Sequence, residues 1–303
     1  MVAPSDGRVL ASTTGLNLHY RDWGGPSPAQ GGQTPVVLLH GLASSCRIYD
    51  LCAPLLAPTR RVVAYDQRGH GETDRPEDGY EIATFVADGA GLAQALHLPE
   101  PYLVVGHSWG ATVALEWAVR HPRQVQAVVL VDGAIVPFRE APGATWERLA
   151  ARLAPPDLSG VTFDDLLERT RVSLGFLDQA FRRSFFEALM EITADGSVRA
   201  RLPRDKHMRI LRMLWDEDVD AAFRELHRTA LALLAERAPS DAEAWQMEEM
   251  RHRMAERLQQ GQPLLRVHWL QDTIHDVPLQ RPALLAEAIL GADTWSTPDQ
   301  GAR

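Results

Sequence analysis

The 303-residue chain contains a single lysine, Lys206, among its 31 basic residues. With 40 acidic residues the formal net charge is −9, and the arginines form no dense basic cluster. Such a charge pattern gives no electrostatic footprint for nucleic acid or for an anionic membrane. The sequence therefore predicts neither nucleic acid nor a membrane surface as a partner.

Long apolar runs are also lacking. No uninterrupted run approaches the roughly 18 apolar residues that suggest a membrane-spanning helix. The segment from Met1 to Ser12 has no positively charged region followed by an apolar core, the pattern of a signal peptide. We therefore expect no membrane span and a cytoplasmic location.

Cysteine is scarce, with only Cys46 and Cys52 in one short segment. Two cysteines without histidine or cysteine neighbours at ligand spacing do not make a zinc site. We expect both to be free thiols in a reducing compartment, and we expect neither a metal nor a cofactor.

Apolar residues make up 45% of the chain, enough for one large domain or for a core domain with an insertion. Short apolar segments typical of strands alternate with helical periodicity, as at 82–96 and 282–290. This alternation predicts an α/β fold whose mostly parallel sheet is covered by helices on both faces. The predicted strands are Leu16–Arg21, Val36–Leu39, Arg61–Tyr65, Tyr102–Val105, Gln126–Val131, Ala230–Ala235 and Leu264–Leu270.

Residues 135–225 break the alternation, because they contain no convincing buried strand. We interpret them as an inserted helical cap, with residues 1–134 and 226–303 forming the core domain. Most of the cap's aromatic residues are expected to form its own core, and a minority to line an acyl pocket. These aromatics are Trp146, Phe163, Phe176, Phe181, Phe185, Phe186 and Trp215.

The sequence Gly-His-Ser-Trp-Gly at 106–110 follows an apolar strand and precedes a helical stretch. A strand that turns sharply into a helix needs small residues on both sides of the turn, and Gly106 and Gly110 supply them. Ser108 is then left at the apex with its hydroxyl exposed. This context predicts a nucleophile elbow.

A serine hydroxyl needs a base within hydrogen-bond reach to become a good nucleophile. His275 is the candidate, because it follows the last predicted strand and comes last in the chain order serine, acid, histidine. Other histidines compete, among them His40, His70, His107 and His268. We expect His268 to be packed within its strand.

Four motifs make the chain resemble the α/β-hydrolase superfamily over nearly all of its length. They are His40-Gly41, the segment 66–71, the elbow around Ser108, and His275-Asp276. The resemblance implies an eight-stranded, mostly parallel sheet with a cap inserted after the sixth strand.

The acid of the predicted triad is the point where the sequence departs from the family pattern. The usual acid lies in a Gly-x-x-Asp turn after the seventh strand, but that strand here continues through Glu236 to Asp241 without a glycine. Asp241 has a structural explanation as a first-turn residue of the next helix. Asp132 follows the strand beside the elbow strand. In this respect the chain resembles dehalogenases and certain lactonases, which carry their catalytic acid after that strand. We favour Asp132 and keep Asp241 and Glu236 as alternatives.

Two backbone N–H groups are expected to form the oxyanion hole. Trp109 supplies one at the start of the elbow helix, and Leu42 supplies the other after His40-Gly41. We expect Asp66 and Arg68 to be structural.

These features predict a serine hydrolase that cleaves carboxylic esters of small, fairly apolar substrates through an acyl-enzyme on Ser108. Because the nucleophile is serine, the dehalogenase and epoxide-hydrolase reactions of the superfamily are disfavoured. A lactonase or C–C bond hydrolase with the same triad is an alternative. A second alternative is a non-catalytic small-molecule binding protein on the same scaffold.

Overall fold

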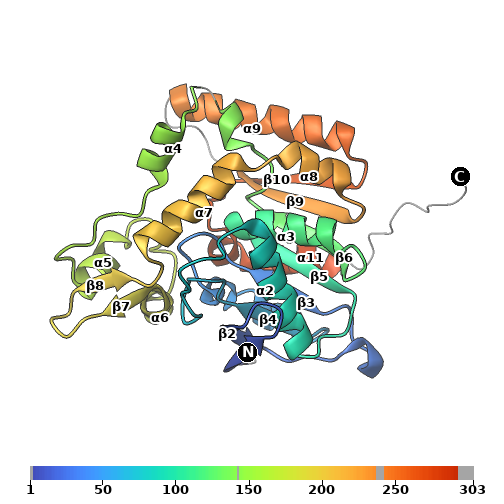
Figure 1. Cartoon of the computed structure of the whole chain (residues 1–303), viewed down its shortest axis with the longest axis horizontal. Coiled ribbons are helices and arrows are strands. Elements are labelled where there is room, and N and C mark those ends of the chain that lie inside the picture. The colour runs from blue at the N-terminus through green and yellow to red at the C-terminus, as the bar shows by residue number, and fades with distance from the viewer. Residues whose placement is uncertain (1–2, 142, 237–241, 293–303) are drawn as a thin grey trace, which may run out of the picture.

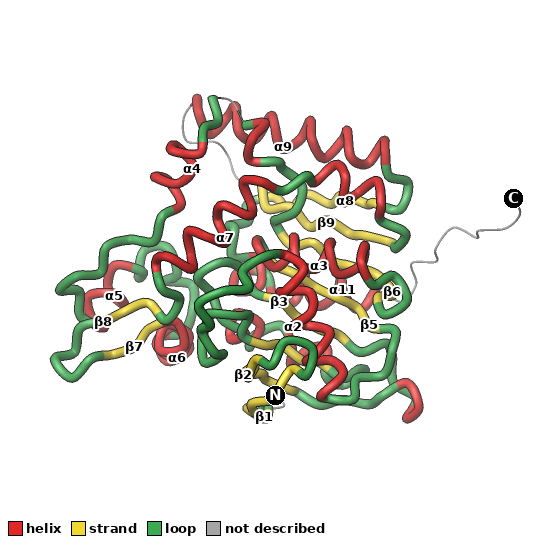
Figure 2. The backbone as a smooth tube through the Cα atoms, in the orientation of Figure 1, coloured by secondary structure: helices red, strands yellow, loops and turns green. Residues whose placement is uncertain are grey.

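The computed structural model describes residues 3–141, 143–236 and 242–292. Its centre is an eight-stranded sheet of order β1-β2-β4-β3-β5-β6-β9-β10 (Figures 1 and 2). β2 pairs antiparallel with β1 and β4, whereas β4, β3, β5, β6, β9 and β10 run parallel to one another. The strands are β1 (Ser5–Ala11), β2 (Leu16–Asp22), β3 (Val36–Leu39), β4 (Val62–Tyr65), β5 (Tyr102–His107), β6 (Val125–Val131), β9 (Thr229–Glu236) and β10 (Leu265–Gln271).

The predicted mostly parallel sheet is confirmed, and each predicted strand occurs within two residues of its expected bounds. β1 was not predicted, because this edge strand is largely exposed and its residues are mostly polar or small. His268 is also placed differently from the prediction. It lies on the edge strand β10 with its side chain exposed rather than packed.

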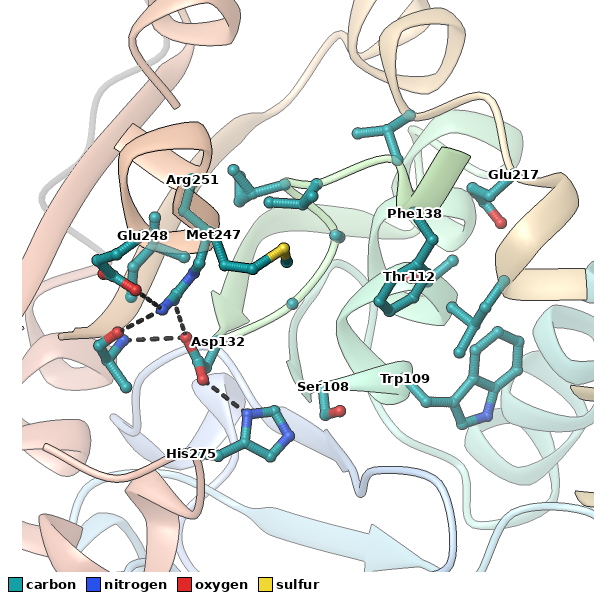
Figure 3. Close-up of a pocket in the computed structure, with 18 of the residues that line it drawn as sticks. Ser108, Trp109, Thr112, Asp132, Phe138, Glu217, Met247, Glu248, Arg251 and His275 are labelled. Atoms are coloured by element: carbon teal, nitrogen blue, oxygen red, sulfur yellow. Dashed lines mark hydrogen bonds and ion pairs between the residues drawn. The ribbon is translucent and has the colours of Figure 1, made fainter. Parts of the chain in front are cut away.

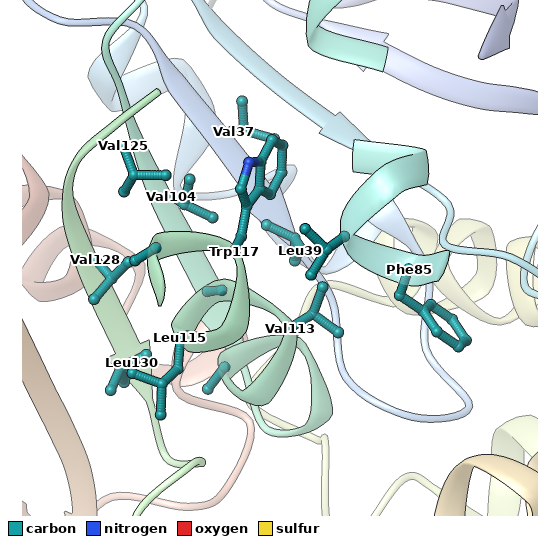
Figure 4. Packing of buried hydrophobic residues seen from close by; sticks show 14 of the residues in the cluster. Val37, Leu39, Phe85, Val104, Val113, Leu115, Trp117, Val125, Val128 and Leu130 are labelled. Carbon is teal, nitrogen blue, oxygen red and sulfur yellow. The ribbon is translucent and has the colours of Figure 1, made fainter. Parts of the chain in front are cut away.

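Strand residues alternate between the two faces of the sheet, so each strand contributes to two cores. Val37 and Leu39 of β3 pack with the helices of one face, whereas Val36 and Leu38 pack with those of the other. Trp117 is fully buried in the first core, beside Val37 and Val104 (Figure 4). The first face is covered by α2 (Ile82–Ala95), α3 (Trp109–Arg120), α8 (Val219–Glu225) and α9 (Ala242–Gly261), and the second by α1 (Ala53–Leu56), α10 (Val277–Gln280) and α11 (Pro282–Gly291).

β6 and β9 are neighbours in the sheet, so the segment between them is an insertion. Most of it extends away from the sheet to one side (Figure 1). No buried strand was expected here, and β7 and β8 form a short, half-exposed hairpin. The inserted elements are α4 (Trp146–Leu153), α5 (Phe163–Arg169), α6 (Gln179–Leu189), β7 (Met190–Ile192), β8 (Val198–Ala200), α7 (Arg204–Asp216) and α8.

The predicted division of the chain at residues 134 and 225 stays a prediction. Val219 and Phe223 of α8 belong to the same buried cluster as α3, a helix of the predicted core. Within the described ranges, no helix has the length and apolar character that crossing a bilayer requires.

Candidate active site

Ser108 lies at the turn between β5 and α3 with φ 54° and ψ −118°, a backbone conformation that L-residues rarely adopt. Glycine neighbours make this turn sterically feasible. A Cβ on Gly106 would lie 2.0 Å from the carbonyl oxygen of Gly110, and one on Gly133 would lie 2.2 Å from that of Ser108. Sharp turns of this kind expose the side chain at their apex.

Asp132 follows β6 directly, and its carboxylate reaches the loop after β10. His275 Nδ1 lies 2.6 Å from Asp132 Oδ2, although 143 residues separate them in the chain. The Asp132 side chain is 8% exposed, whereas that of His275 is 55% exposed. The acid is therefore enclosed and the imidazole opens onto the pocket.

Asp132 and His275 each stabilise the charged form of the other. Burial alone would raise the pKa of Asp132, but the hydrogen bond from His275 and the Arg251 guanidinium hold it below its ordinary value. Partial burial lowers the pKa of His275, and the Asp132 carboxylate more than offsets this, so the net shift is upward. An ionised Asp132 accepts a hydrogen bond from the Nδ1–H group, which leaves Nε2 of the neutral imidazole as an acceptor.

Figure 3 shows the His275 Nε2 edge on the side of the ring that faces Ser108. Both residues line one pocket. No hydrogen bond joins the Ser108 hydroxyl to the ring within the described part of the chain. Catalytic hydrogen bonds of this kind often tighten only when substrate binds.

Arg251 of α9 is a pocket residue that the sequence reasoning missed. Its Nη2 lies 2.5 Å from Asp132 Oδ1, and its Nη1 donates to Glu248 and to the carbonyl oxygen of Ala235. Asp132 Oδ1 also accepts the backbone N–H of Ala235 at 3.0 Å. The carboxylate is therefore fixed from both sides, by α9 and β9 on one oxygen and by His275 on the other.

The alternative acids do not reach His275 in the structure. Glu236 pairs with His252 Nε2 at 3.1 Å and accepts a hydrogen bond from Gln271. Asp241 lies outside the described residues. Of the described candidates, only Asp132 is brought to His275.

The pocket has a volume of about 430 Å³, and its wall is mostly apolar. None of the seven aromatic residues highlighted in the insertion is among the described residues that line it. Phe138 is the aromatic residue of the insertion that lines the pocket. Phe163, Phe185 and Phe186 belong to the buried cluster that also contains Val36 and Leu38 of β3. The apolar wall consists of Trp109, Ala134, Ile135, Val136, Phe138, Leu214, Val219, Leu234, Ala235 and Met247.

The residues predicted to form the oxyanion hole belong to the turn that carries Ser108 and to the loop that follows β3. Trp109 is the first residue of α3, where a backbone N–H has no partner within the helix. A Cβ on Gly41 would lie 3.1 Å from Ser108 Cβ, so the loop that carries Leu42 runs beside the serine. His40 supports this loop, since its ring bonds the carbonyl oxygen of Gly41 and accepts the backbone N–H of Gln67.

His107 links the elbow to the loop of His275. Its Nε2 donates to the carbonyl oxygen of His275 at 2.8 Å, and the two rings lie 4.8 Å apart. Burial and the neighbouring His275 lower the pKa of His107 to about 3, so the ring is neutral. Its position inside the Gly-x-Ser-x-Gly motif was the only signal in the sequence, and it did not indicate this contact.

Two clusters bring metal-ligating atoms within 4.8 Å of one another in the described residues, and both already have partners. In the first, Asp66 binds His19 at 2.8 Å and the backbone N–H groups of Cys46 and Glu72. These contacts anchor a loop, as expected for Asp66, and both cysteines are free thiols. In the second, Glu236 pairs with His252 and Glu248 with Arg251.

Curated relatives match part of the chain. A proline iminopeptidase from Heyndrickxia coagulans is 41% identical over 101 residues, 33% of this chain and 35% of that protein. A 2-hydroxymuconate semialdehyde hydrolase from Pseudomonas sp. strain CF600 is 33% identical over 151 residues, 48% of this chain and 50% of that protein. The chain thus spans between about a third and a half of the length of these relatives.

Solved structures match nearly the whole chain. E-2-(acetamidomethylene)succinate hydrolase has a TM-score of 0.73 at 23% identity, covering 95% of this chain and 98% of that one. A thioesterase domain from the curacin biosynthetic pathway has a TM-score of 0.71 at 20% identity, covering 95% and 99%. At these identities the likeness concerns the fold alone. The profile of the α/β-hydrolase fold matches residues 34–276, and the chain therefore belongs to that family.

Proposed function

We propose that the protein is a serine hydrolase that cleaves carboxylic esters of small, fairly apolar molecules. The observation that carries the proposal is the hydrogen bond between His275 and the enclosed Asp132, beside an elbow serine in the same pocket. An oriented base next to a serine at a strained turn is the arrangement that nucleophilic catalysis needs.

In the proposed reaction Ser108 Oγ attacks the ester carbonyl carbon, and His275 Nε2 takes the hydroxyl proton. The backbone N–H groups of Leu42 and Trp109 stabilise the oxyanion. His275 then gives the proton to the leaving alkoxide, and an acyl-enzyme remains on Ser108. Water activated by His275 hydrolyses that ester and restores the serine. Asp132 holds the imidazole in the required tautomer throughout.

Hydrolysis of p-nitrophenyl esters from acetyl to lauroyl by the wild type and Ser108→Ala tests the proposal. We expect turnover that Ser108→Ala abolishes, and labelling by a fluorophosphonate that mass spectrometry locates on Ser108. The chain-length profile then measures the pocket. An inactive, unlabelled wild type would overturn the proposal and favour a binding role.

The second candidate is hydrolysis of a lactone or of a C–C bond by the same residues. A relative named 2-hydroxymuconate semialdehyde hydrolase supports it, because it is 33% identical over 48% of this chain. A panel of lactones and β-diketones, run beside linear esters, distinguishes the two candidates by their relative kcat/KM.

A further inference from the structure

We propose that Glu217 sets the charge selectivity of the pocket, so that it favours substrates with a positively charged group at the end remote from Ser108 and rejects a carboxylate there. The inference rests on the proposed function and names a substrate class for it. Three observations support it: the position of Glu217, its lack of a partner, and the engagement of the pocket's arginine.

Glu217 caps the carboxyl end of α7 and lines the pocket together with Thr112 and Val219. In Figure 3 it lies across the pocket from His275. Phe138 and Trp109 lie on the same side of the pocket as Glu217. On this mostly apolar side of the pocket, the Glu217 carboxylate is the group that would attract a cation.

Glu217 forms no hydrogen bond or ion pair with any described residue. The acidic residue before it differs, since Asp216 pairs with both Arg139 and Arg212. The other pocket carboxylates also have partners, with Asp132 bound by His275 and Glu248 by Arg251. A partly buried carboxyl group without a protein partner is free to bind a ligand.

Arg251 is the only arginine or lysine among the described pocket residues, and Asp132 and Glu248 occupy it. A substrate carboxylate would therefore meet Glu217 without a free cation among the described residues that line the pocket. Arg120 lines a neighbouring groove together with Glu217, and Glu116 occupies it. Like charges in a site of low polarity repel strongly.

The neighbouring charges affect the ionisation of Glu217. Burial, Glu116 of α3 and the adjacent Asp218 raise its pKa to about 7, and Arg120 of α3 opposes them. The carboxyl group is thus mostly ionised at pH ~8, and a bound cation would favour its charged form further.

The test uses p-nitrophenyl esters of straight-chain acids that end in a methyl, a trimethylammonium or a carboxylate group at matched lengths, assayed at pH ~8. For the wild type we expect kcat/KM on the cationic ester to exceed that on the anionic ester by about tenfold or more. Glu217→Gln should bring the two values to within about threefold while retaining turnover of the methyl-terminated ester.

Glu147→Gln is the matched control, since it removes the same charge from an exposed residue of the insertion that does not line this pocket. It should preserve the selectivity. An unchanged ratio of cationic to anionic ester in Glu217→Gln would overturn the inference.

Failure of the proposed function gives a different result, namely no turnover of the methyl-terminated ester by the wild type. In that case calorimetric binding of an alkyltrimethylammonium ion and of the matching alkyl carboxylate decides the question. The inference is supported if the wild type binds the cation more tightly than the carboxylate and Glu217→Gln loses this difference. Equal binding of the two ions by the wild type contradicts it.

Discussion

Arg251 pairs with the oxygen of Asp132 that His275 leaves free, at a distance of 2.5 Å. One carboxylate is thus shared between a helix that covers the pocket and a loop that carries the proposed base. The guanidinium fixes Asp132, and its positive charge opposes protonation of His275. Both effects can be measured.

Replacement of Arg251 by glutamine should lower kcat by about tenfold to a hundredfold, because Asp132 loses a positioning partner. It should also move the acid limb of the kcat/KM pH profile upward. The guanidinium lowers the pKa of His275, so its removal raises that pKa and the base is lost at a higher pH. The pH profile separates this role from general destabilisation.

Arg253→Gln is the matched control, because Arg253 lies on the same helix with its side chain exposed. It should leave the pH profile in place. Superimposable profiles for wild type and Arg251→Gln would show that Arg251 does not act on His275.

Asp132→Asn should reduce kcat on the order of ten thousandfold, since an amide cannot stabilise the imidazolium or hold the same tautomer. Glu236→Gln, which alters the other described candidate acid, should change kcat by less than about threefold. Steady-state kinetics on one p-nitrophenyl ester suffice. A larger loss in Glu236→Gln than in Asp132→Asn would exchange their roles.

The wild-type kcat/KM should rise with pH through the pKa of His275, which lies above the ordinary histidine value of about 6.5. The sign follows from the base, since only neutral His275 can accept the serine proton and activity is lost as pH falls through its pKa. The measurement is a pH profile with a substrate that does not itself titrate. An acid limb centred well below pH ~6 would contradict the assignment.

Gly133→Ala should disrupt the elbow, because its Cβ would lie 2.2 Å from the carbonyl oxygen of Ser108. We expect a loss of about 1–3 kcal/mol in the free energy of unfolding and a fall in kcat. Gly261→Ala is the control, since a Cβ there meets no atom within 4 Å. Its free energy of unfolding should be no more than about 1 kcal/mol below that of the wild type. Urea denaturation measures both, and equal stabilities would refute the steric argument.

The parallel strands were predictable because each is a short apolar run followed by a turn. Val36–Leu39 was expected with the bounds that the structure shows. β1 and the β7–β8 hairpin were not, since these partly or largely exposed strands lack an apolar run. The local sequence indicates which segments are buried, but it reveals little about strands at a solvent-exposed edge.

The proposed nucleophile and base carry local signals, a glycine-flanked serine and a histidine after the last strand. Arg251 and Glu217 carry none. Their places in the pocket depend on how α9 and α7 pack against the sheet, which is a long-range outcome. Phe138 was overlooked for the same reason, although the aromatics of its segment were noted.

The pairing of β6 with β9 closes the sheet across the whole insertion. Asp132 leaves the sheet where the insertion begins, and His275 lies well beyond its end, whereas Phe138, Leu214 and Glu217 all belong to the inserted segment. Since Val219 and Phe223 of α8 pack in the same cluster as α3, we expect only the part of the segment before α8 to tolerate a change of length or an exchange while the strand pairing remains intact. A chimaera with a foreign segment at that position should acquire a new substrate range and retain the proposed reaction.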